Sequence, residues 1–321
     1  MDADYTQNLR YKLQKRFRRL NSSGPEVFHY ALKQFWGYLH GQAVLRGIVE
    51  DVERRYACHE GAASEIFGEK KGLLFDEEAE SVGIGFFVFK KCAELTGTDE
   101  RVEIQIGAAY GHHKLDEALE FFKSYFIEPV YEHIDEQLDD QRAVLALLRR
   151  YKHKCEWFQR DTLYKMWQAD TSKGEKTLAL HLYEYLHDQG IDFYIEPTSA
   201  SGEIDIISAQ ASEEPLLADA KIFNPEKGKG KEYLASGVKQ IYTYAVDYNE
   251  SFAYLIIYKT CPDDLRLALT EQTAGTPFLT HNNKTIFLVV VDIYPHEKTA
   301  SKQGPLKPLE VTEADLIRVI E

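Results

Sequence analysis

Three charged residues lie in two short apolar segments of the kind that form buried β-strands. Asp205 belongs to residues 202–207 (GEIDII), and Asp219 and Lys221 belong to residues 218–223 (ADAKIF). A charge inside a buried strand costs stability unless it has a partner. Because side chains two residues apart on a strand share a face, Asp219 and Lys221 should point the same way, and Asp205 joins them if the two strands pair.

Two converging carboxylates suit Mg²⁺, which prefers oxygen ligands and keeps several water molecules. Asp205 and Asp219 are the expected ligands, the backbone carbonyl of Ala220 is a further one, and Mn²⁺ is the expected substitute. A bound divalent ion acidifies water and polarises a phosphoryl oxygen, as phosphodiester hydrolysis requires. Lys221 would orient the attacking water or neutralise charge that develops on the phosphate. The alternative is an ordinary strand pair with surface charge, which the spacing of Asp, thirteen residues and Asp-x-Lys disfavours.

The helix expected after these strands carries Gln240 and Tyr244 in the segment QIYTY. Residues at i and i+4 share a helical face, so both side chains can face one site. With the upstream Asp205 and the Asp-x-Lys pair, this pattern resembles the motifs of the PD-(D/E)xK, or restriction-endonuclease-like, nuclease superfamily. The QxxxY spacing is similar to that of its RecB-like branch. The resemblance covers about residues 170–295.

The resemblance implies a further carboxylate on the first helix of the nuclease domain. Glu175 is our choice for this metal ligand because it borders the apolar stripe that starts at Leu178, and Glu184 is the competitor. The alternative for Glu175 is a carboxylate that interacts with the helix dipole. The sequence departs from the family pattern at Ile204, where Pro often stands, and at Asp219, where Glu is commoner. Neither departure removes an oxygen ligand.

The function that the resemblance implies is a Mg²⁺-dependent nuclease that hydrolyses phosphodiester bonds, with DNA favoured over RNA. RecB-like domains joined to an extra helical module occur in bacterial DNA-processing and phage-defence systems, which is the implied context. One alternative is a catalytically silent nucleic-acid or protein binding module with the same fold, and another is an RNA-specific nuclease. The implied catalytic residues are Asp205, Asp219, Lys221, Glu175, Gln240 and Tyr244.

Two domains are expected in 321 residues. Residues 1–168 are expected to form a mainly α-helical domain, because apolar residues recur at intervals of three and four, although residues 102–106 (VEIQI) have the two-residue period of a strand. From residue 169 to 321, helix and strand signals alternate. They predict an α/β class: a restriction-endonuclease-like α/β sandwich with a mixed central sheet. One helical stripe is formed by Leu9, Leu13, Phe17 and Leu20.

The elements expected in the second domain are helices over 175–189, 232–247 and 264–269 and strands over 193–198, 203–208, 216–223, 252–258 and 285–293. The loop over residues 225–231 (PEKGKGK) follows the Asp-x-Lys strand and is expected to be flexible and basic. It either touches the nucleic-acid backbone or is a solvated loop.

The formal charge of −14 argues against a protein that coats nucleic acid non-specifically, although it leaves room for a local basic groove. The first helix is the main basic segment. It could grip phosphates, dock on an acidic partner or be a solvated face, so the N-terminal domain has nucleic acid or protein as its expected partner. The basic residues are Arg10, Lys12, Lys15, Arg16, Arg18 and Arg19.

The start of the chain lacks the basic and apolar regions of a secretory signal, which predicts a cytoplasmic protein. No apolar stretch approaches the roughly 20 residues needed to span a bilayer, so no membrane contact is expected.

Overall fold

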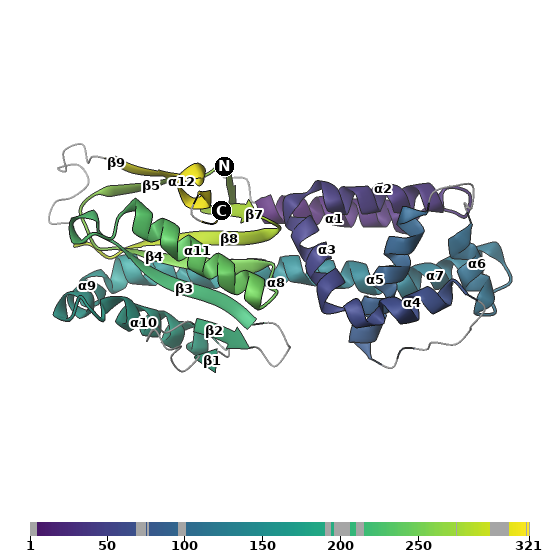
Figure 1. Ribbon diagram of the computed structural model, residues 1–321, viewed down its shortest axis with the longest axis horizontal. Helices are drawn as coiled ribbons and strands as arrows, with labels where there is room; N and C mark the ends of the chain where they lie inside the picture. The colour runs from purple at the N-terminus through teal and green to yellow at the C-terminus, as the bar shows by residue number, and fades with distance from the viewer. Residues whose placement is uncertain are drawn as a thin grey trace. The chain divides into compact units, whose positions relative to one another are not determined.

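The chain forms two compact units in the computed structural model (Figure 1). The helical unit comprises Thr6–Asp140, and the sheet unit comprises Gln141–Glu321 with Met1–Tyr5. The boundary falls inside helix α8 (Glu128–Phe158), so it precedes the change of sequence pattern at residue 169. The structure describes residues 5–68, 75, 77–95, 101–189, 194–195, 206–209, 215–273, 275–295, 308–318 and 320.

The described residues of the helical unit form helices and turns, which confirms a mainly helical N-terminal region. The expected stripe of Leu9, Leu13, Phe17 and Leu20 is buried on α1. None of the helices that the structure describes, in either unit, is both long and apolar enough to cross a membrane. The elements are α1 (Tyr5–Asn21), α2 (Phe28–Gly41), α3 (Ala43–Arg55), η1 (Ala57–His59), α4 (Glu60–Ile66), α5 (Glu78–Glu94), α6 (Val102–Ala109), α7 (Leu115–Phe122), η2 (Lys123–Ile127) and the first part of α8.

The strand expected over residues 102–106 is wrong, because this segment lies in helix α6. Gly107 allows α6 to approach α7 closely: a Cβ there would lie 2.1 Å from the carbonyl oxygen of Ala118. Glu103, which a two-residue period would place on an exposed face, is buried beside His29, with Oε1 and Nδ1 2.7 Å apart. Helix packing therefore overrides the β-branched pattern of a five-residue window.

The sheet unit is built on a mixed sheet with the strand order β1-β2-β3-β4-β8-β7-β6. Strands β3, β4 and β8 are parallel to one another, whereas β1 and β2 on one side and β6 and β7 on the other run antiparallel to their neighbours. This confirms the mixed α/β class. The strands are β1 (Tyr194–Ile195), β2 (Ile206–Ala209), β3 (Pro215–Phe223), β4 (Phe252–Lys259), β6 (Glu271–Thr273), β7 (Thr276–His281) and β8 (Lys284–Asp292).

Helices cover both faces of this sheet (Figure 1). Helix α11 (Lys231–Asp247) packs on one face, where Val238 and Ile241 meet Leu255 and Ile257 of β4 in a buried core. The second part of α8, together with α9 (Arg160–Ala169) and α10 (Gly174–Asp188), belongs to the same unit. Two helices and three strands expected from the sequence, α10, α11, β3, β4 and β8, are confirmed within one residue at each end.

A hydroxyl network fastens α8 and α10 to the other face of the sheet. The hydroxyls of Tyr151 on α8 and Tyr258 on β4 are 2.6 Å apart, and Tyr258 donates to the Leu178 carbonyl of α10 at 3.1 Å. Burial raises the pKa of both tyrosines well above its ordinary value, so the hydroxyls stay protonated. This network fixes the height of α10 on the sheet.

The helix expected over residues 264–269 is wrong. Residues Asp264–Ala268 form strand β5, which pairs in parallel with β9 (Pro308–Thr312) in a separate two-stranded sheet. Leu265, Leu267 and Leu269 follow the two-residue period of a strand and pack on the α11 core. Helix α12 (Glu313–Ile317) follows β9.

Candidate active site

Strand β3 presents Asp219 and Lys221 on the face that α11 covers. Both side chains are 7% exposed, and Nζ of Lys221 lies 2.9 Å from Oδ2 of Asp219. Leu217 and Phe223, at the same two-residue period, belong to the core with α11. The shared face expected from the Asp-x-Lys spacing is therefore present.

Helix α11 makes room for Lys221 at Gly237. A Cβ on Gly237 would lie 2.7 Å from Cγ and 3.0 Å from Cε of Lys221, closer than side chains pack. The aliphatic part of Lys221 thus lies directly against the helix backbone. This contact restricts the side chain and directs its ammonium group along the face of β3 toward the carboxylates.

Glu175 reaches the same place from the first turn of α10. The turn before the helix is closed by Asp170, whose carboxylate accepts hydrogen bonds from the backbone N–H of Ser172 at 3.0 Å and from its hydroxyl at 2.5 Å. These bonds lower the pKa of Asp170. Gly174 then lets α10 start against Trp167 of α9, since a Cβ would lie 2.5 Å from Cδ1 of the indole. The turn and the close contact set where α10 begins and therefore where Glu175 lies in its first turn.

The carboxylate of Glu175 lies at the edge of β3. It accepts hydrogen bonds from the backbone N–H of Ile222 at 3.0 Å, from the Tyr233 hydroxyl at 2.7 Å and from Nζ of Lys229 at 3.2 Å. Nζ of Lys221 is 3.7 Å from its Oε1. Glu175, Asp219 and Lys221, chosen from the sequence, are thus brought together, whereas the competitor Glu184 is exposed on α10.

The carbonyl of Ala220 faces this same edge. In an extended strand the N–H and C=O of one residue point to the same side, and adjacent residues alternate. The Ile222 N–H points to Glu175, and the Phe223 carbonyl accepts from Thr260 on the β4 side at 3.1 Å. Ala220, two residues before Ile222, therefore directs its carbonyl toward the Glu175 side.

Asp205 lies outside the described residues, so its position is not part of the site described here. The nearest described residue is Ile206 of β2, which is in register with Ala218 of β3, the residue before Asp219. The described parts of the expected strands over 193–198 and 203–208 are β1 and β2, and these pair with each other.

Gln240 and Tyr244 lie on the stripe of α11 that passes over the site. The Gln240 amide donates to the Tyr244 hydroxyl at 3.0 Å. Gly237, which lies against Lys221, and Tyr233, which donates to Glu175, precede Gln240 by three and seven residues. Tyr233, Gly237, Gln240 and Tyr244 therefore share one face of α11. The expected i, i+4 pair of Gln240 and Tyr244 is present. It lies on the same face of α11 as Tyr233, the residue that contacts Glu175.

Two residues of the site, Lys229 and Tyr233, were not chosen from the sequence. The spacing of Tyr233, Gly237 and Gln240 at i, i+4 and i+7 is the signal that could have identified Tyr233. Lys229 belongs to the loop expected to be flexible. In the structure this loop closes on itself through backbone hydrogen bonds between Asn224 and Lys229, of 2.8 and 3.0 Å, and has a left-handed Gly228 with φ 74°.

The lysines of this loop contact their own unit. Lys227 lies over the Trp167 ring, with Nζ 4.6 Å from the ring centroid, and Lys229 binds Glu175. Lys231 lies 3.3 Å from Asp315 of α12. The loop is therefore anchored at three points beside the site.

The donor set of the site consists of oxygen atoms, which suits a hard divalent cation such as Mg²⁺ or Mn²⁺. Glu175 and Asp219 supply carboxylates, and Ala220 supplies a carbonyl. Within the described residues, no three Asp, Glu, His or Cys side chains form a metal-binding group, so Asp205 would have to complete a three-carboxylate site.

Some basic residues of α1 contact other side chains of the helical unit, and others are exposed. Arg10 binds Asp135 at 2.8 Å and also pairs with Asp139, and the Arg16 guanidinium lies 3.9 Å from the centroid of the Tyr38 ring. Lys12, Lys15, Arg18 and Arg19 are exposed. Arg10 therefore serves the packing of the helical unit, and the exposed residues keep the three roles expected from the sequence open.

No protein-family model matches the chain, and neither a curated protein nor a solved structure matches it significantly. The resemblance to PD-(D/E)xK nucleases therefore stays a prediction from the motif residues. Any functional assignment depends on the chemistry of the site itself.

Proposed function

We propose that the sheet unit is a Mg²⁺-dependent nuclease with a restriction-endonuclease-like α/β sandwich, and that it hydrolyses phosphodiester bonds of DNA. The observation that supports this most is the meeting of Glu175 from α10 with Asp219 and Lys221 from β3. Two carboxylates and one lysine from two elements, with Asp219 and Lys221 buried and Glu175 partly exposed, form an arrangement suited to phosphoryl chemistry.

The metal ligands in this proposal are Asp219, Glu175, the Ala220 carbonyl and Asp205. When bound, Mg²⁺ would acidify a water molecule and polarise a phosphoryl oxygen. Glu175 also holds the Ile222 N–H and the Tyr233 hydroxyl, so it fixes the edge of β3 to α10 and α11.

Lys221 is the catalytic lysine in this proposal. Its stem is confined by Gly237, so its ammonium group cannot swing freely and can stabilise charge at one position on the phosphate. Gln240 and Tyr244 would position the substrate along α11. Lys229 is an additional phosphate contact, available once a metal replaces its ammonium group on Glu175.

The proposed metal ligands and Lys221 would serve the hydrolysis of DNA and of RNA equally well. We propose DNA because of the RecB-like QxxxY spacing. A role in bacterial DNA processing or phage defence follows from the same resemblance. The helical unit would supply a nucleic-acid or protein contact through the exposed basic residues of α1.

The test is cleavage by the purified protein of single-stranded DNA, duplex DNA and RNA in parallel, with Mg²⁺, with Mn²⁺ and with EDTA. Mg²⁺-dependent cleavage of DNA, lost in Asp219→Ala, is the expected result. Cleavage of RNA alone would make RNA the substrate in place of DNA. Binding of DNA without cleavage would favour a catalytically silent binding module. Activity that survives EDTA would overturn the nuclease assignment.

A further inference from the structure

Exposed aromatic rings gather at the end of α8 in the sheet unit. Trp157 is 76% exposed and Phe158 is 78% exposed, the two largest values among the large hydrophobic side chains that the structure describes. His153 is also exposed, and its ring plane lies within 28° of that of Trp157 and 21° of that of Phe158, with centroids 5.6 and 5.9 Å apart. These three residues are called the aromatic platform. A contiguous group of exposed rings, unlike a single one, indicates a binding surface.

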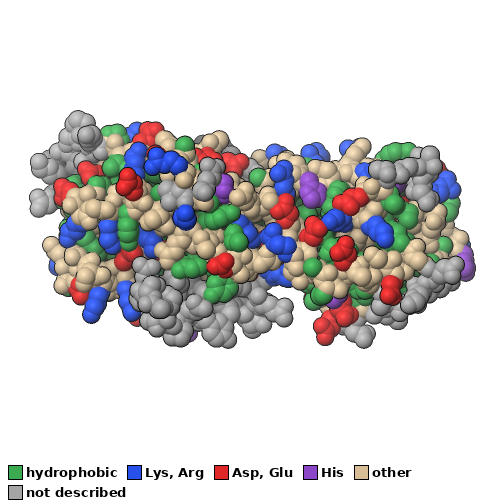
Figure 2. All heavy atoms as spheres, viewed as in Figure 1, with side chains coloured by type: hydrophobic (Ala, Val, Ile, Leu, Met, Phe, Trp, Pro, Cys, Tyr) green, Lys and Arg blue, Asp and Glu red, His purple; other side chains and the backbone are tan. Residues whose placement is uncertain are grey.

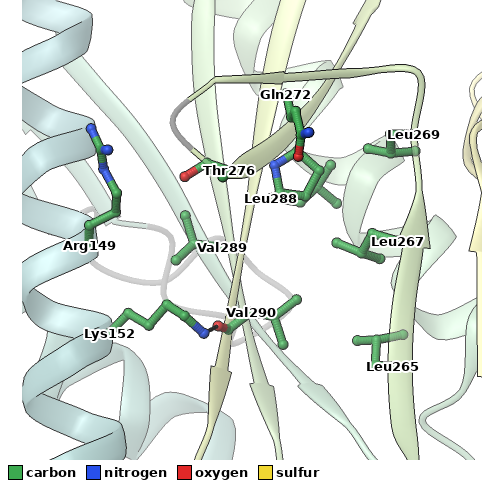
Figure 3. A pocket seen from close by; sticks show the side chains of 12 residues that line it. Arg149, Lys152, Leu265, Leu267, Leu269, Gln272, Thr276, Leu288, Val289 and Val290 are labelled. Carbon is green, nitrogen blue, oxygen red and sulfur yellow. Dashed lines mark hydrogen bonds between the residues drawn. The ribbon is translucent and has the colours of Figure 1, made fainter. Parts of the chain in front are cut away.

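The aromatic platform lies on the side of α8 that the sheet does not cover. Figure 3 shows Arg149 and Lys152 directed toward a cavity beside β8. Lys152 donates to a backbone carbonyl of β8, and the Tyr151 hydroxyl meets a hydroxyl of β4. Successive helical residues are turned by about 100°. Trp157 therefore points away from the side that these three residues occupy.

The charges beside the platform are mainly positive. On the face of the molecule that Figure 2 draws, acidic and basic side chains are intermixed. Residues 149–165, by contrast, contain six Lys or Arg and two acidic residues, in a chain with a formal charge of −14. One of the two acids, Glu156, is turned to the sheet, where it accepts a backbone N–H of β8 at 2.8 Å. Arg150 and Lys154 precede Trp157 by seven and three residues, so they share its helical face.

We propose that the aromatic platform and these cations bind the unpaired nucleotides of a single-stranded nucleic acid. Every nucleobase has a flat face that can stack on an aromatic ring, and the phosphate joined to each nucleotide would meet Arg150 or Lys154. In a duplex the base faces are stacked on one another, so rings on the outside of a helix cannot reach them. DNA and RNA share this chemistry when they are single-stranded.

The path from the platform to the candidate active site supports this occupant. Helix α9 begins at Arg160, two residues after Phe158, and its ten residues extend about 15 Å. Near its end stands Trp167, which contacts Lys227 and limits the space at Gly174, the first residue of α10. A strand held on the platform would therefore be led along α9 toward the site. This last step rests on the proposed nuclease function, whereas binding of the strand does not.

The first experiment measures binding of a fluorescein-labelled oligothymidylate to the full chain by fluorescence anisotropy. EDTA in the buffer prevents metal-dependent cleavage. The matched control is an abasic strand with the same number of phosphates, and we expect the thymidylate to bind at least about fivefold more tightly because its bases stack. Equal affinities, or no binding of either strand, would overturn the proposal and leave a protein as the occupant of the platform.

An oligouridylate of the same length is the RNA arm of this experiment. Stacking uses the base and not the sugar, so we expect it to bind as well. Binding of either strand above the level of the abasic control supports the proposal and shows which sugar is accepted.

Variants of the rings test stacking directly. Trp157→Ala should weaken binding of the thymidylate at least about fivefold, whereas Trp157→Phe keeps a ring and should stay close to the wild type. Val246→Ala, on a side chain of α11 that is 49% exposed, is the control and should change nothing. Wild-type affinity in the double variant Trp157→Ala with Phe158→Ala would overturn the proposal.

Variants of the cations separate phosphate contacts from stacking. Arg150→Gln together with Lys154→Gln should flatten the dependence of log affinity on log salt by about 0.7 for each lost phosphate contact. Trp157→Ala should weaken binding and leave this slope unchanged. A slope that stays at the wild-type value in the double glutamine variant would contradict the phosphate contacts.

This proposal and the nuclease proposal fail in different experiments. Binding in EDTA that depends on Trp157, without cleavage when Mg²⁺ is added, would support the platform and overturn only the nuclease. If the protein does cleave, Trp157→Ala should raise KM for a single strand more than it lowers kcat, as expected when binding shared by the ground state and the transition state is lost. A fall in kcat alone would contradict a binding role for the platform.

Discussion

Two lysine–aspartate pairs lie in the same sheet, and their lysines have similar burial, although Asp219 is 7% exposed and Asp292 is 25% exposed. Lys221 and Asp219 are 2.9 Å apart, Lys259 and Asp292 are 3.1 Å apart, and the lysine side chains are 7% and 6% exposed. Burying a charged pair is costly unless hydrogen bonds satisfy its remaining groups, so the surroundings of each pair indicate its role.

The pairs differ in what else surrounds each lysine. Lys259 donates to the Cys261 carbonyl at 2.8 Å, and its aspartate stands opposite it on β8, so this lysine ties together the ends of two parallel strands. Lys221 lies between carboxylates of two elements, on one strand face with Asp219 and 3.7 Å from Glu175. A buried lysine–aspartate pair is thus no sign of catalysis by itself; a second carboxylate beside it is the informative feature.

The largest expected effect is that of Asp219→Ala, which removes a proposed metal ligand. Cleavage should fall to the level seen with EDTA, and calorimetry with Mn²⁺ should show weakened binding, because fewer oxygen ligands remain. Ca²⁺ in the wild type should preserve DNA binding but suppress cleavage. Wild-type metal binding by the variant would contradict this role for Asp219.

Lys221→Ala should slow cleavage by on the order of 10²-fold, as expected when charge in the transition state goes unstabilised. Metal binding should persist, since a cation is removed and no ligand is lost. Single-turnover cleavage and Mn²⁺ calorimetry separate the two properties. Loss of metal binding together with activity would make Lys221 a structural residue.

Lys259→Met is the matched change at the other pair, and it should act on stability. The loss of charge-assisted hydrogen bonds to Cys261 and Asp292 should cost about 1–3 kcal/mol in the free energy of unfolding. Urea denaturation measures this cost, and the cleavage rate of the folded protein should stay at the wild-type value. A rate loss like that of Lys221→Ala would remove the distinction between the pairs.

Gln240→Ala should reduce the cleavage rate about tenfold, because it removes a proposed positioning residue while leaving the proposed metal ligands in place. The Tyr244 hydroxyl would lose its amide donor but keep its place on α11. Thermal unfolding should be nearly unchanged. An unaltered rate would mean that the QxxxY spacing is accidental.

The smallest expected effect is that of Lys229→Met, which removes a cation that would compete with the proposed metal for Glu175. The side chains are 27% and 23% exposed, so a gain of about two- to fivefold in Mn²⁺ affinity is expected, within the range for partly solvated pairs. Lys227→Met, on the same loop but over Trp167, is the control. Weaker metal binding by Lys229→Met would show that Lys229 supports Glu175 instead.

The part of the site that the sequence predicted is the part fixed by local periodicity. Asp219 and Lys221 share a face because of their spacing on one strand, and Gln240 and Tyr244 meet because of theirs on one helix. Glu175 was placed by resemblance, and its contacts with Ile222 and Tyr233 are specific to the folded chain.

What the sequence missed depends on contacts between distant segments. Residues 264–268 are too short to indicate their partner, and only pairing with β9 makes them a strand. Lys229 contacts Glu175 because the loop closes through backbone hydrogen bonds between Asn224 and Lys229. From its composition alone, this loop is expected to be a flexible basic stretch. Residues 102–106 lie in α6, whose close approach to α7 at Gly107 involves a segment outside the five-residue window.

The position of Tyr151 on α8 has a consequence for which stretch of the gene encodes the complete sheet unit. A gene segment that began at residue 169 would encode the sheet without the Tyr151 phenol, whose hydroxyl meets that of Tyr258. A crossover that moved this sheet into another gene would have to fall upstream of Tyr151, inside the codons of a continuous helix.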